Sequence, residues 1–324
     1  MTSRPFVAAL VAALIATTAN AAIIATAASA TDGDRPGNAA DKVDPQRFTK
    51  KLDPAYGAFQ RGLYRTAYNL ALEKAKQGDG PSQVLVAEIL ARGLGIARNE
   101  KEAADWYRRA AEQGIPEAQF QYALLLIDGR YVKKDKNEAF ALMEAAAEAG
   151  NALAQFNFAQ MLVERDRGPK GMARAVDYYE RAAKAGLPDA QYAMAQIDAD
   201  GVGGRPKDEA EARRWLALAA RQNFDTAQLD LGTWLVQGRG GAKDEKGGFR
   251  ILKRAAESGN VAAQNRVAKL YLNGIGTDPD STFAAAWYIL ARRAGLIDPL
   301  MEDFMNGLTD AEIKTAVVRA NRLR

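Results

Sequence analysis

The chain of 324 residues contains no histidine and no cysteine. Without these side chains it cannot form a Ser-His-Asp or Cys-His catalytic group, a zinc site with the usual ligands, or a disulfide. It also lacks a large excess of either charge, since 44 Lys and Arg stand against 40 Asp and Glu. This mild, mixed excess indicates a solvated surface and argues against a nucleic-acid groove. The stability of the fold must therefore come from packing, which a chain of this length can supply.

An internal repeat of about 36 residues runs through most of the chain. A pair of the Ala-Gln type marks each repeat, and the successive spacings are 36, 36, 36, 37 and 36 residues. The pairs are Ser82-Gln83, Ala118-Gln119, Ala154-Gln155, Ala190-Gln191, Ala227-Gln228 and Ala263-Gln264. A column of bulky residues keeps the same phase at Trp106, Leu142, Tyr178, Trp215, Ile251 and Trp287. This period is typical of stacked helix pairs, because no single pair can bury its own apolar face.

Glycine columns close both predicted helices of the repeat. The first helix ends at Gly93, Gly129, Gly201, Gly238 and Gly274, and the second ends at Gly114, Gly150, Gly186, Asn223, Gly259 and Gly295. Because Asn tolerates a left-handed backbone, Asn223 predicts a positive φ for this second column. The glycine-rich turns 201–204 and 238–241 look like fragments of a phosphate-binding loop. Such a loop must follow a strand, and each of these follows a predicted helix, so we expect no cofactor there.

These columns together resemble the Sel-one-like (Sel1-like) repeat, a branch of the tetratricopeptide superfamily. The match is seen from Gln83 to Gly114, with Gly93-Leu94-Gly95 and Trp106-Tyr107 in the family positions. The resemblance implies an all-α fold, a right-handed α-solenoid of stacked antiparallel helix pairs with about six full repeats. It also implies one degenerate N-terminal repeat, at Tyr56–Gly78, and a C-terminal capping helix. The family's paired cysteines are missing, so the β-lactam-related activities of its cysteine-rich members are not expected.

One repeat departs from the pattern at the end of its first helix. Arg165 stands where the other repeats have glycine, and residues 166–171 replace the usual loop. We therefore expect a turn of different shape at this point. The repeats themselves are predicted to occupy residues 55–299, followed by a C-terminal cap at 300–324. In that cap Thr309 and Glu312 have the form of a capping box, and the apolar stripe behind it is Ile313, Ala316, Val317 and Ala320.

The N-terminus has the layout of a secretory signal peptide at residues 1–30. An apolar run from Phe6 to Ala16 follows Arg4, and small residues suited to cleavage come after it. Residues 31–54 are rich in Gly, Pro, Asp and Asn and are predicted to form a flexible leader. We expect export to the periplasm of a Gram-negative bacterium. An uncleaved anchor in the inner membrane is the alternative, because Pro5–Ala30 is uncharged and long enough to span a bilayer.

The first helices carry three columns whose identities change from repeat to repeat, at two, five and nine residues after the Gln. The spacings of three and four keep these columns on one side of the helix, and the resemblance implies that this side lines the concave face of the superhelix. Side-chain amides and acids there suit an extended peptide with basic residues. The candidate partner-binding residues are Gln121, Asn157, Gln160, Gln196, Asp128, Glu164, Asp200, Arg266 and Lys269. Ordinary solvated positions are the alternative interpretation.

Three functions compete. The first is a non-catalytic exported adaptor that binds a protein or peptide of the cell envelope, since the family's members serve as scaffolds, and some exported bacterial relatives restrain membrane sensor kinases. The second is a glycan or cell-wall binder, for which the column Phe120, Phe156 and Tyr192 would have to stand free and not pack between helices. The third is a hydrolase built on carboxylates such as Asp198, Asp200, Glu209 and Glu211. We expect no enzyme, metal or nucleic acid, and membrane contact only through an uncleaved signal segment.

Overall fold

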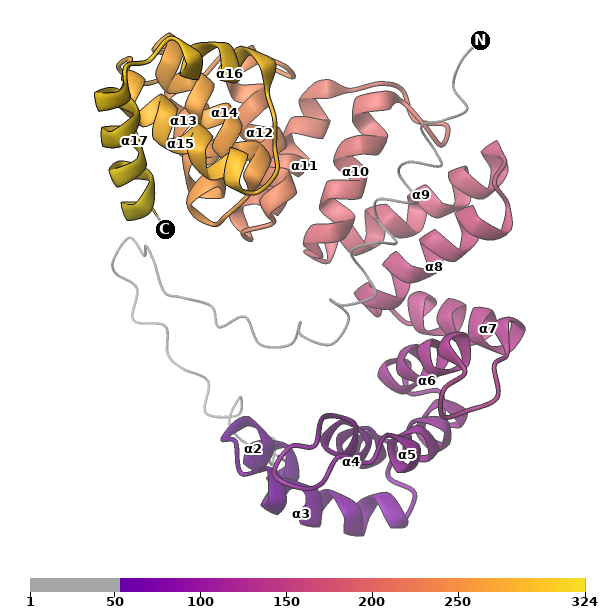
Figure 1. The fold of residues 1–324 in the computed structure, drawn as a ribbon. Helices are drawn as coiled ribbons and strands as arrows, with labels where there is room; N and C mark the ends of the chain where they lie inside the picture. The colour runs from indigo at the N-terminus through magenta and orange to yellow at the C-terminus, as the bar shows by residue number, and fades with distance from the viewer. Residues whose placement is uncertain (1–52, 324) are drawn as a thin grey trace, which may run out of the picture. The chain divides into compact units, whose positions relative to one another are not determined.

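The computed structural model describes residues 53–323, and the predicted signal peptide and almost all of the predicted leader lie outside that range. Within it the chain forms sixteen helices and no strand, which confirms the all-α fold class. The helices belong to two compact bodies, of which the first ends at Arg165 and the second begins at Asp166. Both bodies are built from helix pairs joined by short turns (Figure 1).

In the N-terminal body each helix packs against the next one along the chain. Its helices are α2 (Pro54–Gln60), α3 (Tyr64–Lys76), α4 (Gly80–Arg92), α5 (Glu100–Glu112), α6 (Pro116–Asp128), α7 (Lys136–Glu148) and α8 (Ala152–Arg165). The seven-residue α2 is the shortened first helix of the predicted degenerate repeat. In that repeat α3 keeps the phase of the later second helices, because its small residues Ala67 and Ala75 are buried.

The C-terminal body continues the same pattern and adds two helices after the last repeat. Its helices are α9 (Pro169–Lys184), α10 (Pro188–Asp200), α11 (Glu209–Arg221), α12 (Asp225–Gln237), α13 (Glu245–Glu257), α14 (Val261–Asn273), α15 (Ser281–Arg293), α16 (Pro299–Asn306) and α17 (Asp310–Arg322). The predicted capping box forms at the start of α17, where the Thr309 N–H donates to Glu312 Oε2 at 2.8 Å. This helix packs on α15 and buries Ala316 and Ala320 of the predicted stripe.

The predicted backbone of the helix ends is confirmed. All described glycines of the two columns have positive φ, and Asn223 is the one non-glycine residue with positive φ among residues 53–323, at 63°. The departure predicted at Arg165 is also present, because α8 runs through that residue without a glycine cap. Only residues 166–168 then separate it from α9.

A second glycine in four of the turns has a different role, which the glycine columns of the sequence do not predict. A Cβ added to Gly240 would lie 2.2 Å from the carbonyl oxygen of Glu209 in α11, and one on Gly276 would lie 2.2 Å from that of Glu245 in α13. Gly95 and Gly203 approach α3 and α9 in the same way, though less closely to backbone atoms. These turns therefore lie directly on the second helix of the preceding repeat, and glycine is needed for that close approach.

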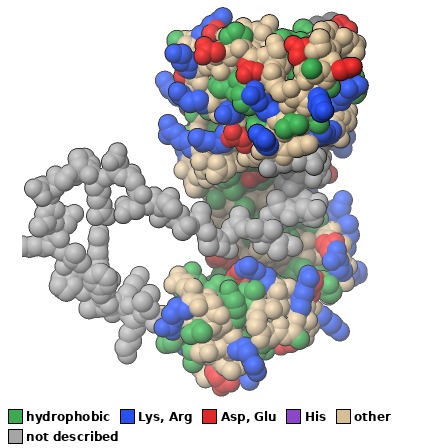
Figure 2. Space-filling model, turned by 60° about the vertical axis from the view of Figure 1, so that its left-hand side comes forward, with side chains coloured by type: hydrophobic (Ala, Val, Ile, Leu, Met, Phe, Trp, Pro, Cys, Tyr) green, Lys and Arg blue, Asp and Glu red, His purple; other side chains and the backbone are tan. Residues whose placement is uncertain are grey.

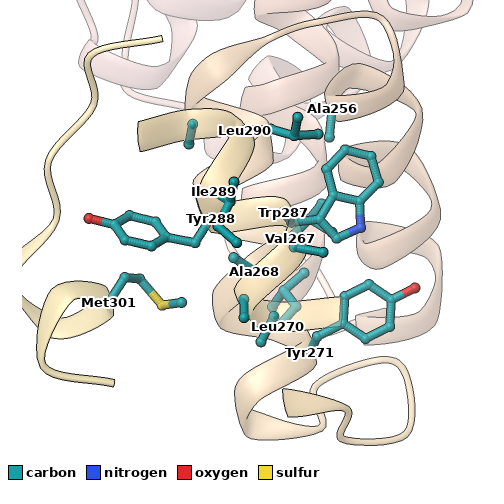
Figure 3. Close-up of a cluster of buried hydrophobic side chains, with 14 of the residues drawn as sticks. Ala256, Val267, Ala268, Leu270, Tyr271, Trp287, Tyr288, Ile289, Leu290 and Met301 are labelled. Carbon is teal, nitrogen blue, oxygen red and sulfur yellow. The ribbon is translucent and has the colours of Figure 1, made fainter. Parts of the chain in front are cut away.

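The core is made mainly of alanine columns, with large side chains filling the space between them. In the last repeat Ala284, Ala285 and Ala286 are fully buried beside Trp287 and Tyr288. The two aromatic side chains leave α15 on different sides, and Tyr288 lies toward Met301 of α16 (Figure 3). Small residues allow the helices to approach closely, and the aromatic rings occupy the remaining gaps.

In five of the six full repeats a buried glutamine of the first helix joins the repeat to the preceding helix. The Nε2 atom of this glutamine donates to the carbonyl oxygen of an alanine eight residues earlier, at the end of the preceding second helix, over 3.1–3.3 Å. The pairs are Gln83 with Ala75, Gln155 with Ala147, Gln191 with Ala183, Gln228 with Ala220, and Gln264 with Ala256. We call these the glutamine links. Each of these carbonyl oxygens also accepts the backbone N–H three residues later, over 3.0–3.1 Å, so the glutamine is an additional donor at the helix end.

Candidate interaction surface

The candidate residues of the N-terminal body lie on the first helices α6 and α8. Gln121, Asn157 and Gln160 are partly buried, whereas Asp128 and Glu164 are exposed. The Asn157 Nδ2 atom donates to the Leu153 carbonyl oxygen of its own helix at 2.8 Å. The Gln160 Nε2 atom is buried without a hydrogen-bond partner among the described residues. Because this donor is buried, a partner could reach Gln160 only through the part of its side chain that remains exposed.

The acidic candidates share a position that helix stability does not explain. Asp128 is the last residue of α6, Asp200 is the last residue of α10, and Glu164 lies in the last turn of α8. The helix dipole disfavours negative charge at a C-terminal end. Only Asp128 has an ion pair given by the structure, with Arg130 Nε at 3.3 Å, and both of these side chains are more than half exposed. These acids therefore remain accessible to a cationic partner.

In the C-terminal body a polar cluster surrounds Gln196 on the first helices α10 and α12. The Tyr192 hydroxyl donates to Asp230 Oδ2 at 3.0 Å. Burial raises the pKa of Asp230, while hydrogen bonds from Tyr192 and Gln196 and the charges of Arg266 and Arg239 oppose that rise. Asp230 belongs to the first variable column but was not among the candidates. Its partial burial beside an aromatic hydroxyl is a property that the sequence alone does not reveal.

The two basic candidates of α14 differ in what they contact. Lys269 Nζ forms an ion pair with Asp298 Oδ2 at 2.5 Å, and Asn265 Nδ2 donates to the same oxygen at 2.8 Å. Burial alone would raise the pKa of Asp298, but these two hydrogen bonds outweigh it and lower the pKa. Lys269 thus ties α14 to the start of α16. Arg266 is exposed, and within residues 53–323 it has no ion pair, so it is the more available cation.

The three variable columns are not solvent-facing throughout. In the column two residues after the Gln, Leu85 is 9% exposed and Ala193 is fully buried. This column therefore lies at the edge of the packing between neighbouring first helices. The column nine residues after the Gln is exposed in every repeat, at Arg92, Asp128, Glu164, Asp200, Gln237 and Asn273.

The aromatic column proposed for sugar stacking lies within the packed structure. Phe120 is 2% exposed and Phe156 is 3% exposed. The Tyr192 ring packs against Phe224, with 5.4 Å between ring centroids. The interpretation that these rings pack between helices is therefore confirmed for the two phenylalanines, and this column gives no support to the glycan hypothesis.

Three of the four carboxylates proposed for hydrolysis, Asp198, Glu209 and Glu211, are held in ion pairs. Glu209 contacts Lys207 Nζ at 2.9 Å and Arg239 Nε at 3.1 Å, and Glu211 contacts Arg214 at 2.9 Å. Asp200 is exposed. Among the described residues, no group of three or more Asp and Glu side chains could hold a metal ion. The part of the chain that the structure describes also contains no helix long and apolar enough to cross a membrane.

Asp198 is an exception among these carboxylates, because it is 1% exposed in a column that is otherwise apolar. The residues at this position in the other repeats are Leu90, Leu126, Leu162, Leu235 and Tyr271. Arg205 Nε contacts Asp198 Oδ1 at 2.7 Å and also reaches Glu180 through Nη1 at 3.2 Å. Burial raises the pKa of Asp198, and the Arg205 hydrogen bond only partly offsets this effect. The residue therefore has a structural partner and lies beneath the surface.

The surface as a whole is mixed in charge. On the face shown in Figure 2, lysine and arginine side chains lie among acidic, apolar and neutral ones. This distribution agrees with the near balance of charges in the sequence, in which the formal net charge is +4.

Solved structures with similar sequences share this repeat architecture, and one curated protein matches part of the chain. A Sel1 repeat protein from Oxalobacter formigenes is 25% identical, with a TM-score of 0.62, and the match covers 76% of this chain and all of that one. A protective antigen of uropathogenic Escherichia coli with an SLR fold is 26% identical, with a TM-score of 0.54, over 79% of this chain and 63% of that one. Chitin synthase regulatory factor 3 of Schizosaccharomyces pombe is 35% identical over 91 residues, 26% of this chain and 10% of that protein. This chain thus spans about a tenth of that regulator's length.

The match to a family model covers two thirds of the 324 residues. The Sel1 repeat model matches residues 80–115, 116–151, 152–187, 188–224, 226–260 and 261–296. Each of these six segments contains one helix pair, from α4–α5 in the first segment to α14–α15 in the last. The chain belongs to the Sel1 repeat family.

Proposed function

We propose that the chain is a non-catalytic scaffold that binds a protein or peptide partner through the first-helix face. Sel1 repeats generally mediate protein–protein interactions. We assign the binding surface of the N-terminal body to Gln121, Gln160, Asp128 and Glu164. In the C-terminal body we assign it to Gln196, Asp200 and Arg266.

The observation that carries this proposal is the contrast between the buried and exposed positions of one helix type. The glutamine links recur in five of the first helices with nearly the same geometry. On the same helices the exposed column nine residues after the Gln reads Arg, Asp, Glu, Asp, Gln and Asn. Variation along this exposed column indicates a surface that stacking does not require, and acids at helix C-terminal ends favour a partner with basic groups.

We further propose that the chain is exported and acts in the cell envelope of a Gram-negative bacterium. The support comes from the sequence of residues 1–30, which has the charged, apolar and small-residue segments of a signal peptide. Mass spectrometry of the N-terminus of the protein isolated from cells would test this, because cleavage after a small residue near position 21 or 30 is the expected result. An intact N-terminus in a membrane fraction would instead support the anchored form.

The test of the binding face is affinity purification from cross-linked cell envelopes. The native chain is compared with a variant in which Gln121, Asn157, Gln160 and Gln196 are changed to Ala. A second variant, with exposed amides outside the variable columns changed to Ala at Gln60, Gln77 and Asn306, serves as the control. We expect a partner that the native chain and the control recover and the first variant loses. Equal recovery by all three would contradict the choice of face.

A further inference from the structure

A pocket of about 510 Å³ lies in the C-terminal body, away from the variable columns of the first helices. Its walls come from the second helices α11 and α13, and its lining includes Leu231 and Leu235 of α12. Four arginines line it, Arg213, Arg214 and Arg221 from α11 and Arg254 from α13, whereas no acidic residue does. The pocket thus combines an apolar lining with several guanidinium groups.

The repeat does not require these arginines for stacking. The column that contains Arg213 holds small or apolar residues in the other full repeats, at Ala104, Phe140, Val176, Phe249 and Ala285. The column that contains Arg221 holds mainly acids and other charges, at Glu112, Glu148, Lys184, Glu257 and Arg293. Two turns of α11 bring Arg213, Arg214 and Arg221 to one pocket. None of the other full repeats carries more than one arginine at these three positions.

The guanidinium groups are held in position but are poorly neutralised. Arg213 Nη1 donates to the Ala242 carbonyl oxygen at 2.9 Å, which fixes it against the turn before α13. Arg214 pairs with Glu211, but its side chain is 77% exposed, and such surface pairs contribute only about 0–1 kcal/mol. Arg221 and Arg254 are exposed, and within residues 53–323 neither forms an ion pair. Like charges around one pocket repel each other, so an anion would relieve this repulsion.

The spacing of the arginines limits the shape of the anion. Arg214 and Arg221 are seven residues apart on α11, which is about 10 Å along a helix axis. A single phosphate or carboxylate group is too small to contact both. In an extended peptide the side chains at positions i, i+2 and i+4 share one face, and positions i and i+4 are about 13 Å apart, a span that the long Glu and Arg side chains can match.

We propose that this pocket binds an acidic peptide segment of a partner protein, in which two carboxylates four residues apart flank an apolar side chain midway between them, all on one face of the extended segment. Guanidinium groups match carboxylates because they can donate two parallel hydrogen bonds. The apolar side chain occupies the space beside Leu231, Leu235 and Ile251. The volume lies within the range of about 300–1,000 Å³ that is usual for ligand pockets. This second site is independent of the first-helix face, so a scaffold could hold two partners at once.

The test measures binding of a fluorescein-labelled peptide, Ser-Glu-Gly-Leu-Gly-Glu-Ser, to the full-length chain by fluorescence anisotropy. Two exposed positions are changed in the double variant Arg221→Gln/Arg254→Gln. The matched control is Lys246→Gln/Arg250→Gln, which removes two exposed charges of α13 that do not line the pocket. We expect the first variant to weaken binding by at least about tenfold, because charge-assisted hydrogen bonds are lost, and the control by less than about twofold.

Two changed peptides make the test independent of the variants. Replacing both Glu residues of the peptide by Gln, or its Leu by Ser, is expected to weaken binding to the native chain by about tenfold or more. Binding should also weaken as salt rises. No binding of the original peptide, or equal binding to both double variants, would overturn the proposal. So would binding of phosphatidylglycerol vesicles that is lost in Arg221→Gln/Arg254→Gln while the peptide does not bind, because the pocket would then be a lipid site.

Discussion

The turns after α10 and after α12 belong to consecutive repeats. They share one backbone hydrogen bond but differ in the side chain at the position of its acceptor. In the first, the Asp208 N–H donates to the Asp198 carbonyl oxygen at 2.7 Å, and in the second the Asp244 N–H donates to the Leu235 carbonyl oxygen at 2.9 Å. The side chain at that position is a buried carboxylate in one turn and a leucine in the other. The backbone bond between the helix and the N-cap of the next helix therefore fixes the turn, which leaves the side chain free to vary.

The turn with the carboxylate is also longer by one residue. Seven positions separate Gly201 from the N-cap Asp208, whereas six separate Gly238 from Asp244. The longer turn carries Arg205, whose guanidinium reaches back to Asp198 and Glu180. A buried polar pair and an extra residue thus occur together, which accounts for the one spacing of 37 in the repeat. Four experiments on stability test how these two turns and the helices beside them are held.

The largest effect is expected where a turn touches a backbone atom. Gly240→Ala places a Cβ 2.2 Å from the Glu209 carbonyl oxygen at a φ of 69°, so we expect a loss of about 4 kcal/mol in the free energy of unfolding. Gly204→Ala in the longer turn meets nothing within 4 Å and should lose only about 1 kcal/mol, from its positive φ. Urea unfolding followed by circular dichroism measures both. Equal losses would show that the turn after α12 can move off α11.

The next effect concerns the buried pair. Arg205→Ala removes the partner of a carboxylate that is 2% exposed, and the expected loss is about 3 kcal/mol. The double variant Asp198→Leu/Arg205→Ala restores the apolar column and should recover most of that loss. Arg98→Ala, which breaks an exposed pair with Glu100, is the control and should change stability by less than about 1 kcal/mol. If the double variant is no more stable than Arg205→Ala alone, the longer turn needs Arg205 for another reason.

A smaller effect is expected for the glutamine links. Gln228→Ala removes the side-chain donor to the Ala220 carbonyl oxygen, which keeps the Asn223 N–H at 3.1 Å, so the expected loss is that of one hydrogen bond, about 0.5–1.5 kcal/mol. Gln237→Ala changes an exposed position of the same helix and should stay within about 0.5 kcal/mol. Hydrogen exchange would locate the effect at the end of α11. Similar costs for the two substitutions would mean that the link does not hold the repeats together.

The smallest effect is a difference in pH dependence. Burial raises the pKa of Asp198 in the folded chain, so its contribution is present below its ordinary pKa and is lost as pH rises through the raised value. Stability of the native chain relative to Asp198→Asn should therefore improve as pH falls from neutral. Asp298, whose pKa is lowered because bonds from Lys269 and Asn265 outweigh its burial, should show the opposite sign in Asp298→Asn. Urea-unfolding midpoints measured from pH 7 down to acidic pH would distinguish Asp198→Asn from Asp298→Asn. Parallel curves for the two variants would contradict the opposite directions of the two pKa shifts.

The sequence predicted those parts of the fold that depend on local backbone rules. Asn223 in a glycine column indicated positive φ, and Arg165 in place of glycine indicated the altered turn, because both follow from the chemistry of one residue. The glutamine links were not predicted, since the Ala-Gln pair was treated only as a marker of phase. Their role depends on where the preceding helix ends in space.

The candidate site was harder to predict, because burial decides which of its residues are available. Lys269 and Arg266 look alike in sequence, but only the structure shows that Lys269 is occupied by Asp298. Asp198 was proposed as a catalytic carboxylate, although the apolar residues in its column were a signal that it lies inside. The arginines of α11 lie within nine residues of the sequence, but the pocket that they line exists only where α12 and α13 pack beside α11. Partner binding by the first-helix face remains a prediction.

The open position of Gly204 has a practical consequence for engineering this chain. The turn that contains it already accepts one residue more than its neighbours, and a side chain there meets no atom within 4 Å. A short epitope or a fluorescent-label sequence inserted after Gly204 should therefore leave the register of the flanking helices unchanged. The same insertion after Gly240 would push the turn away from α11, next to the arginine pocket. Gly204 is thus a suitable insertion site for a reporter of partner binding that leaves the partner surfaces unchanged.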